Sequence, residues 1–458
     1  LASSAASDVY KRQYMFGTAE ATPSGASATA AAAPAPAPAA SAIPYKRHGD
    51  KSIWGIFIML CLISVIELYS ASSREVASAG VYGPILRHCI MLGVGVAIVW
   101  TLEKVHYKWF FGLTWILAGL SLLAMIYVSA FGEIVNGARR SVSLFGITLQ
   151  PSEFIKMSAV LVVARIMARS QKKSIGVNNS GIIWSALWVL AFGAVLFKQG
   201  LTNTILLMMI SVAMMVLGGT EWKKLLVVGL VYSVIAGGAF LLKDAFSDKE
   251  PAAVTAVTNA PEDVANQRHH TWEARVSRYF SSTPKYEEPI TATNRQEQYS
   301  YMAQANGGLI GVFPGNSRET ARLPLAFSDY IFAIILEDLG FIGGFFLLLL
   351  YLALLARAGV IARKCHRAFP VLLVIGMAVM IVLQALFHMA ITTGAFPVSG
   401  QPLPLISKGG TSILVTSIAF GAMLSVSRTA VQNGSKQAVK EELSELPEDL
   451  RANNPVQF

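Results

Sequence analysis

The stretch Leu325–Leu355, LAFSDYIFAIILEDLGFIGGFFLLLLYLALL, decides the fold class of this chain. A helix that crosses a bilayer needs about 20 predominantly apolar residues, and this stretch exceeds that length. Asp329 stands near its start, and Glu337 and Asp338 lie further in, where a carboxylate without a partner is costly. The stretch therefore predicts a membrane-spanning helix whose acidic residues need a structural or functional explanation.

The composition of the whole chain places it in the membrane class. Its 458 residues are 54% hydrophobic and only 14% charged, and the mean hydropathy is +0.52. Soluble domains carry about 25% charged residues. The formal net charge of +10 is typical of cytoplasmic anchoring residues in a membrane protein, so it does not indicate nucleic acid. The three cysteines are too few and too scattered for a disulfide framework or a zinc site.

Ten apolar runs predict an all-α polytopic membrane protein with ten transmembrane helices. The runs cover residues 54–73, 84–102, 109–131, 152–168, 181–198, 201–219, 224–243, 329–356, 369–393 and 410–428. They form a membrane domain over residues 51–430, followed by a charged cytoplasmic tail over 431–458. Residues 1–50 are rich in Ala, Pro and Ser and predict a disordered N-terminal arm; LASSAASDVYKRQ at its start looks foreign to the rest.

Basic residues in every second connection predict that both termini lie in the cytoplasm. These residues are Lys46, Arg47, Lys51, Lys104, Lys108, Arg165, Arg169, Lys172, Lys173, Lys223, Lys224, Arg357, Arg363, Lys364, Arg367, Arg428 and Lys436. The same alternation places the connection 244–328, between the seventh and eighth helices, on the extracytoplasmic side. Its Gly-rich run NGGLIGVFPGN favours a shaped loop, since long connections between helices are usually functional or disordered.

Arg139 and Arg140 stand in a connection that the charge pattern places outside, against the usual distribution of basic residues. Two adjacent guanidinium groups suit a phosphate or diphosphate, because each can donate two hydrogen bonds to it. Contact with lipid headgroups, or an ion pair with Glu133, is the alternative interpretation.

The run Leu149–Met157, LQPSEFIKM, predicts a helix that begins at Pro151 and has Glu153 in its first turn. Lys156 lies three residues after Glu153, on the same helical face and inside the apolar run. A lysine inside a membrane segment is a candidate functional residue by default. The alternative is a lysine that snorkels to the membrane surface.

The run Phe396–Val415, FPVSGQPLPLISKGGTSILV, contains too many prolines and glycines for a regular helix. Among them are Pro402, Pro404, Gly409 and Gly410. Irregular backbone at membrane depth occurs only where protein buries it or where it lines a wet cavity. We therefore expect a re-entrant or cavity-lining segment that carries Lys408, with a plain surface loop as the alternative.

Asp329 has two interpretations from composition alone. Ser328 or Asp329 could cap the N-terminus of the helix, an interaction worth about 1 kcal/mol, or the carboxylate could serve chemistry at the membrane surface. Glu337 lies deeper and needs a partner. The sequence contains no CxxC, HExxH, GxSxG or P-loop pattern that would indicate a soluble enzyme.

Six stretches together resemble one known family. They are LYSAS (68–72), NGARR (136–140), LQPSEFIK (149–156), ANGGLIGVFPGNS (305–317), SDYIFAIILEDLG (328–340) and GQPLPLISKGGTS (400–412). With order and spacing retained over residues 54–428, they resemble the SEDS family (shape, elongation, division and sporulation), the FtsW and RodA type of peptidoglycan glycosyltransferase. The lysine in SKGGTS is similar to that of division proteins from Bacteroidetes.

The resemblance implies a SEDS fold of ten helices and a lipid II substrate, which is a disaccharide-peptide on an undecaprenyl diphosphate. It places the essential loop carboxylate at Asp329. The candidate substrate-binding residues are Lys156, Arg140, Arg139, Arg275, Gln296 and Lys408. The candidate residues that shape the cavity are Glu153, Glu337, Gln384, Pro402, Pro404, Gly409 and Gly410.

The chemistry that the family performs fits these residue types. Asp329 is expected to act as general base on the acceptor 4-hydroxyl, while the cationic residues stabilise charge on the departing diphosphate. Inversion at C1 then gives a β-1,4 linkage from an α-linked donor. We expect no tightly bound cofactor and no dedicated metal site, although Mg²⁺ or Mn²⁺ could accompany the diphosphate.

The resemblance also implies partners and a location. The expected partners are a class B penicillin-binding protein (a transpeptidase), other division proteins and membrane lipids, with no nucleic acid. The expected location is the bacterial cytoplasmic (inner) membrane at the division septum. The alternatives are an elongation-type polymerase, a lipid II flippase and a scaffold that holds division proteins.

Three departures from the family pattern put a detailed map of the cavity in doubt. FKQGLTNTILL (197–207) has Lys198 near a place where many members carry an acidic residue. His388 stands where an asparagine is common after Gln384, and PLAF replaces a proline–histidine pattern before Asp329.

Overall fold

The computed structural model describes residues 49–71, 82–135, 138–144, 147–171, 176–197, 200–246, 279, 288–291, 294–323, 326–365, 367–397 and 399–445. Its helices are α2 (Lys51–Ala71), α4 (Tyr82–Lys104), α5 (Lys108–Phe131), α6 (Pro151–Arg169), α7 (Asn179–Phe197), α8 (Leu201–Leu217), α9 (Trp222–Phe246), α11 (Arg295–Gly307), α12 (Ile331–Ala362), α13 (Ala368–Thr392) and α14 (Gly410–Glu445). Each of the ten predicted apolar runs overlaps one of these helices, and α11 is a further helix inside the connection 244–328. The predicted arm, up to residue 48, lies outside the described residues.

Seven helices in the described part are long and apolar enough to cross a membrane: α2, most of α4, α5, α7, α12, α13 and the first part of α14. Helix α8 is apolar but shorter. The chain is therefore a multi-pass membrane protein. Helix α6 falls outside this set because it carries four charged residues, Glu153, Lys156, Arg165 and Arg169; 14 of its 19 residues are buried. Since protein surrounds α6, its side chains need not be soluble in lipid.

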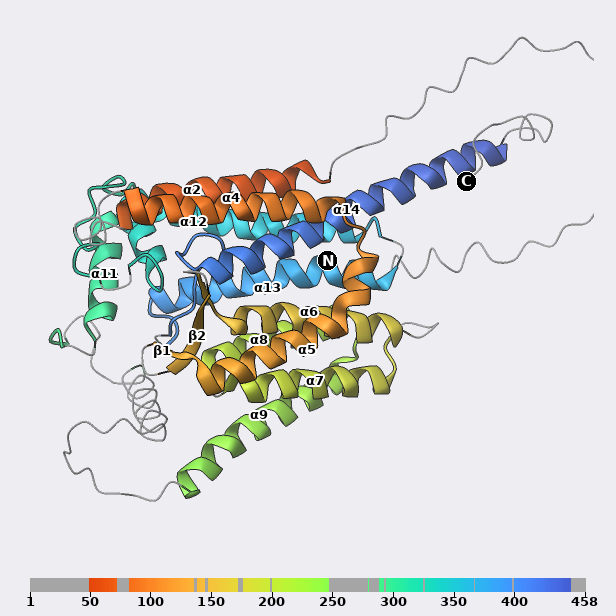
Figure 1. The fold of residues 1–458 in the computed structure, drawn as a ribbon, viewed down its shortest axis with the longest axis horizontal. Helices are drawn as coiled ribbons and strands as arrows, with labels where there is room; N and C mark the ends of the chain where they lie inside the picture. The colour runs from red at the N-terminus through yellow and green to blue at the C-terminus, as the bar shows by residue number, and fades with distance from the viewer. Residues whose placement is uncertain are drawn as a thin grey trace, which may run out of the picture.

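The two helices at the centre of the bundle are α13 and α14 (Figure 1). In their membrane-spanning windows 78% and 83% of the residues are buried, against 28–39% in the other candidate spans. Helices α2, α4 and α12 lie on one side of them, and α5 to α9 lie on the other. Helix α14 packs against α4, and α13 packs against both α12 and α6. The outer helices thus present most of their apolar side chains to lipid.

A small antiparallel sheet interrupts the predicted all-α architecture. Its strands are β1 (Glu133–Val135), β2 (Ala138–Leu144) and β3 (Ile147–Leu149), in the order β1-β2-β3. The register pairs Ile134 with Arg139 and Val142 with Leu149. Polar and apolar residues alternate over Ser141–Leu144 (SVSL) in the second half of β2, which is the period of a strand. The connection that carries Arg139 and Arg140 therefore contains short strands that were not predicted from the sequence.

Helix α12 is broken, although its sequence predicts one continuous span. Gly340 has φ 67° and ψ −173°, which are not helical. The segment before it bonds to the loop that follows α11: the N–H of Val312 donates to the Glu337 carbonyl oxygen (2.9 Å), and that of Phe313 to the Asp338 carbonyl oxygen (2.8 Å). After the break, the N–H of Phe341 donates to Gly308 (2.9 Å). The loop thus satisfies backbone groups that the break would leave unpaired.

This close approach of two backbones gives a testable prediction. A Cβ at Gly307 would clash with the Leu336 carbonyl oxygen. We expect Gly307→Ala to destabilise the protein by about 1–3 kcal/mol, because backbone must move to make room. The matched control is Gly359→Ala, where nothing lies within 4 Å, and which should gain about 0.5–1 kcal/mol. Thermal unfolding of both variants in detergent measures the difference, and equal midpoints would contradict the packing described.

Helix α14 extends further than the last predicted span. It runs to Glu445, so the first part of the predicted tail 431–458 continues the helix. Figure 1 shows this part projecting beyond the rest of the bundle. The sequence VQNGSKQAVKEELSE contains no proline, and the strong helix formers after Asn433 and Gly434 outweigh the weak helix preference of that pair.

Candidate functional site

Asp329 lies in the turn before α12 and is half-buried. The hydroxyl of Ser328 donates to its Oδ1 atom (3.0 Å). Its Oδ2 atom faces Gly400, where a Cβ would lie 2.9 Å away. The N-cap position of α12 belongs to Tyr330, so Asp329 precedes the helix rather than capping it. The carboxylate is therefore held at the junction between this turn and the segment 399–409.

The segment 399–409 is irregular and largely buried, as the prolines and glycines predict. Gln401, Leu403, Leu405, Ile406 and Ser407 are all buried, which excludes a plain surface loop. The hydroxyl of Ser407 donates to the Ser328 carbonyl oxygen (2.7 Å). The N–H of Lys408 donates to the Phe327 carbonyl oxygen (2.9 Å). These bonds attach the segment directly to the turn that carries Asp329.

Three further predicted residues of this segment have clear places. The Lys408 ammonium lies 4.6 Å from the centroid of the Phe327 ring, and Phe327 stands two residues before Asp329. The carbonyl oxygen of Pro404 accepts a hydrogen bond from the Tyr351 hydroxyl (2.7 Å). Gly409 ends the irregular segment, and Gly410 is the first residue of α14.

Lys156 is fully buried, which excludes snorkelling. Its ammonium group donates to Glu153 Oε1 at 2.7 Å, and this ion pair lies within α6. The second oxygen of Glu153 accepts from the Gln384 amide (3.2 Å), which also donates to the Pro402 carbonyl oxygen (3.4 Å). The pair is thus linked to the segment 399–409, two residues from the glycine that Asp329 faces.

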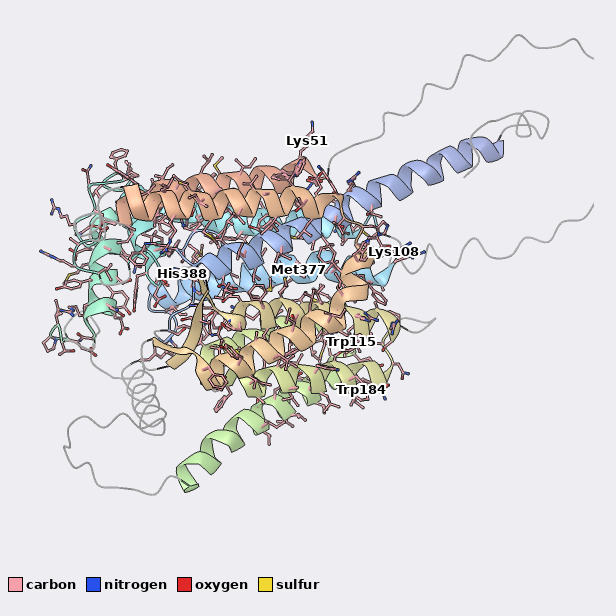
Figure 2. The ribbon with its side chains drawn as sticks, viewed as in Figure 1. Lys51, Lys108, Trp115, Trp184, Met377 and His388 are labelled. Carbon is pink, nitrogen blue, oxygen red and sulfur yellow. The ribbon has the colours of Figure 1, made fainter. Side chains whose placement is uncertain are left out.

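A second polar chain reaches the same segment, and only one of its members stood out in the sequence. His388 Nδ1 lies 2.6 Å from the Gln401 carbonyl oxygen. The Gln401 amide donates to Asn203 Oδ1 (2.9 Å) on α8. Figure 2 places His388 at the same end of the bundle as the strands and α11. Asn203 and Gln401 lie in or beside apolar runs, and that was the signal available to find them.

Glu337 has the partners that its depth demanded. The side chains of Asn306 and Ser317 donate to it, the first at 3.3 Å. The backbone N–H groups of Arg318 and Glu319 donate as well, at 3.0 and 3.4 Å. These donors occupy both oxygens of the carboxyl group, so its hydrogen-bonding capacity is satisfied. Glu337 therefore anchors the loop after α11 to the first half of α12.

The predicted arginines and glutamine are less closely tied to this cluster. Arg139 and Arg140 lie on β2, at the end of the bundle where the strands are drawn (Figure 1), and their side chains fall outside the described part. Arg275 lies outside the described residues altogether. Gln296 is half-buried in the first turn of α11, which packs against α12.

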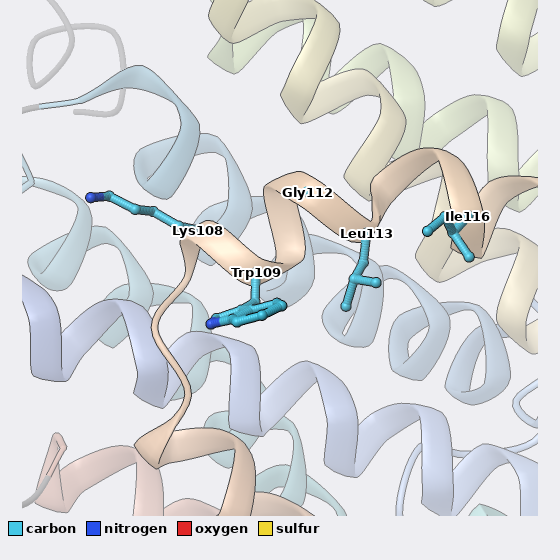
Figure 3. A pocket seen from close by; sticks show the side chains of 5 residues that line it. All are labelled: Lys108, Trp109, Gly112, Leu113 and Ile116. Carbon is cyan, nitrogen blue, oxygen red and sulfur yellow. The ribbon is translucent and has the colours of Figure 1, made fainter.

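An open hollow of about 410 Å³ lies elsewhere, at the beginning of α5 (Figure 3). It is lined by Lys108, Trp109, Gly112, Leu113 and Ile116. Figure 2 shows Lys108 at the opposite end of the bundle from His388. The Trp109 side chain is 65% exposed and Ile116 64% exposed, as expected for a surface that faces lipid. This hollow is therefore separate from the cluster around Asp329.

The family model for FtsW, RodA and SpoVE, described as "Cell cycle protein", matches residues 50–432. The chain belongs to the FtsW/RodA/SpoVE family. A protein named "Probable peptidoglycan glycosyltransferase FtsW" from Taylorella equigenitalis is 30% identical over 67% of this chain and 76% of its own length. One of the same name from Coxiella burnetii is 27% identical over 81% and 95%. "Peptidoglycan glycosyltransferase MrdB" from Escherichia coli K12 is 25% identical over 83% and 94%.

Solved structures show the same fold. A chain of a peptidoglycan synthase complex, solved to describe how polymerization and crosslinking are coordinated, superposes with a TM-score of 0.62 at 22% identity. The match covers 84% of this chain and 99% of that one. The rod shape determining protein RodA from Thermus thermophilus superposes with a TM-score of 0.57 at 23% identity, over 84% and 99%.

The six stretches that carry the FtsW/RodA resemblance gather at one end of the bundle. They lie at the end of α2, around β1 and β2, at the start of α6, after α11, at the start of α12 and before α14. In Figure 1 this is the end that carries α11 and the strands. Residues far apart in the sequence thus form one region around Asp329. The similarity to Bacteroidetes division proteins stays a prediction.

Proposed function

We propose that this chain is a peptidoglycan glycosyltransferase that polymerises lipid II into glycan strands. Its FtsW and MrdB relatives carry the name of that activity. The observation that carries the proposal is the arrangement around the segment 399–409. A half-buried carboxylate, Asp329, lies on one side of it, and the Lys156–Glu153 pair is linked to it through Gln384.

In the proposed reaction, Asp329 removes the proton of the acceptor sugar 4-hydroxyl. The hydroxyl oxygen attacks C1 of the donor sugar, and the bond from C1 to the diphosphate oxygen breaks. The configuration at C1 inverts, and undecaprenyl diphosphate leaves. Gly400 has no side chain, and a Cβ at this position would lie only 2.9 Å from the Asp329 carboxylate. A base of this kind contributes about 10²–10⁴-fold to the rate.

The leaving diphosphate needs cations. Lys408 lies beside the turn that carries Asp329, and Arg139 and Arg140 on β2 and Arg275 are the further candidates. Lys156 is neutralised by Glu153 in this structure, so direct contact with diphosphate requires Lys156 to exchange that partner. The ion pair therefore also has a positioning role, through Gln384 and Pro402.

A divalent cation is proposed only as a companion of the substrate. The described residues contain no group of three or more His, Cys, Asp or Glu side chains that could hold a metal ion. Mg²⁺ or Mn²⁺ would have to take most of its ligands from the diphosphate and from water, as Mg²⁺ commonly does with phosphate substrates.

We infer ten membrane spans, with both termini in the cytoplasm and Asp329 at the extracytoplasmic side. Alternating basic connections support this orientation, and each predicted span overlaps a helix. The membrane in question is the bacterial cytoplasmic (inner) membrane. The connection that contains α11 would then cover the extracytoplasmic end of the bundle, where the sugars of lipid II lie.

Purified protein incubated with labelled lipid II separates the candidate activities. A polymerase yields glycan polymer. A flippase moves lipid II across a vesicle membrane without forming polymer, and a scaffold does neither. Absence of polymer from the native chain in the presence of its partner would reject the proposal.

The expected partner is a class B penicillin-binding protein whose single membrane helix packs against α12. The centre of the bundle encloses α13, whereas α12 exposes Phe341 (63%), Ile342 (56%) and Phe345 (50%). We expect Phe345→Ala to weaken copurification of such a partner, and Leu230→Ala on α9, 65% exposed, to leave it unchanged. Gly343→Leu is a poorer test, because a Cβ at Gly343 would clash with Leu339 beside the helix break. Equal copurification of both alanine variants would place the partner elsewhere.

We propose a role in cell division, with other division proteins as further partners. The relatives include several FtsW proteins but also the MrdB protein, so elongation is the alternative role. A fluorescent fusion in the native host should concentrate at the septum, and a signal spread along the side wall would favour elongation.

A further inference from the structure

Two buried carboxylates take no part in the site described above. Glu67 lies on α2 and Asp338 on α12, and the exposed fraction of each side chain is 0%. Within the described part of the chain, none of their four carboxylate oxygens has a hydrogen-bond partner. Buried polar atoms almost always have partners, so four unpartnered oxygens in one place require an explanation.

The two side chains lie on helices that pack against one another. Helix α2 packs against α12, and Glu67 and Asp338 lie close enough for their charges to repel. Ser70 follows Glu67 by one turn and lies beside Asp338, outside the geometry of a full hydrogen bond. Its hydroxyl oxygen accepts the N–H of Gly315 (3.1 Å). The pair is thus enclosed by α2, by α12 and by the loop after α11.

The neighbouring charges do not compensate this pair. Glu337 adds a further negative charge on the α12 side. On α4, which also packs against α2, His88 is hydrogen-bonded to Ser64 (2.7 Å) and feels the positive charge of Lys408. Arg87 on α4 is exposed. Residues 410–427 of α14, the remaining element against α2, contain no charged side chain.

Adjacent residues of α12 make the contrast plain. Glu337 receives donors from two side chains and from the backbone of 318–319, so its oxygens are hydrogen-bonded. Asp338 and Glu67 receive none within the described residues. Two uncompensated charges side by side in a medium of low dielectric would cost far more than the binding of a proton.

We propose that Glu67 and Asp338 form a proton-binding site, in which the two carboxyl groups together hold at least one proton at neutral pH where α2 meets the break in α12. A proton is favoured over a metal ion because the site offers two carboxylates and one hydroxyl, whereas hard cations take six or more oxygen ligands. The bound proton comes from solvent, and the O–H group it forms can donate to the other carboxylate. The titration then belongs to the pair rather than to either residue.

The site has a mechanical consequence for the fold. A singly or doubly protonated pair allows α2 and α12 to stay in contact beside Gly340, and a doubly ionised pair would push them apart. Since the unfolded carboxyl groups lose their protons at about pH 4 and the folded pair keeps one, stability should fall in the wild type as the pH rises from about 4 through neutral pH. Glu67→Gln and Asp338→Asn, which cannot ionise at the changed position, should lose less stability over the same range.

Infrared difference spectroscopy on the full-length protein in detergent tests this directly. At neutral pH, the wild type should show the carbonyl stretch of a protonated carboxyl group, shifted on exchange into D₂O. That band should be lost or reduced in Glu67→Gln and in Asp338→Asn. Glu337→Gln, which removes the adjacent, hydrogen-bonded carboxylate, is the matched control and should leave the band in place.

Two results would overturn the proposal. One is a wild-type spectrum at neutral pH with no protonated-carboxyl band that Glu67→Gln or Asp338→Asn removes. The other is a midpoint of thermal unfolding that rises with Na⁺ or Mg²⁺ in the wild type but not in Glu67→Gln, together with absence of the band. That second result would make the pair an ionised cation site. A variant that fails to fold leaves the other variant and the wild-type band as the test.

Discussion

Asp329→Asn should abolish the formation of glycan polymer from lipid II, with a fall in rate of about 10²–10⁴-fold. The substitution keeps the shape of the side chain and removes its ability to take a proton. Because the carboxylate is half-buried in a turn and its Ser328 donor can bond equally well to an amide oxygen, folding should be unaffected. Gel separation of labelled product from purified protein gives the measurement.

A matched control comes from the same turn. Ser328→Ala removes the hydroxyl that donates to Asp329 but leaves the carboxylate, so its activity should fall far less. Thermal unfolding of both variants should match the parent. Polymer formed by Asp329→Asn at the parental rate would remove Asp329 from the role of base, whatever the family of the chain.

Lys156→Met should have the largest effect on stability. It leaves Glu153 buried with the Gln384 amide as its one remaining partner among the described residues, and breaking a buried ion pair from one side costs about 3–5 kcal/mol. The variant should unfold at a much lower temperature than the parent or fail to accumulate. Thermal unfolding in detergent, together with the yield of folded protein, provides the measurement.

The double variant Lys156→Met with Glu153→Gln separates structure from chemistry. It removes both charges, so much of the lost stability should return. If Lys156 also meets the substrate diphosphate, the refolded double variant should still polymerise about 10²–10³-fold more slowly than the parent. Full activity in the double variant would restrict Lys156 to a structural role, and parental stability in the single variant would contradict the buried pair itself.

The positions of the helices follow closely from the sequence, because an apolar run in a membrane must satisfy its own backbone hydrogen bonds and therefore forms a helix. The break at Gly340 does not follow, because it lies within an apolar run and its backbone partners come from residues 308–313. Helix α11 is polar and lies in a connection, so its sequence has no hydrophobic periodicity from which the helix could be predicted. The strands are only three to seven residues long, which is too short for a clear alternating pattern in the sequence.

The candidate site divides in the same way. Asp329 and Lys156 are conspicuous as charges in apolar surroundings, and recurrent motifs carry them. The partners of Glu337, namely Asn306, Ser317 and the backbone beside it, are known only once the loop folds back on α12. Glu67 is one acidic residue in an apolar run, and its relation to Asp338 depends on how α2 and α12 pack.

The interruption of α12 also governs how force passes through the molecule. A continuous helix is stiff along its axis, so a tilt at one end reappears at the other. Here α12 is divided at Gly340 into a short segment that begins beside Asp329 and a longer segment that follows. Hydrogen bonds to residues 308–313 connect the two segments. A load applied at Phe341 or Phe345, just after the break, therefore reaches the first part of α12, and with it the turn that carries Asp329, also through residues 308–313. The loop after α11 therefore couples the two segments of α12 mechanically.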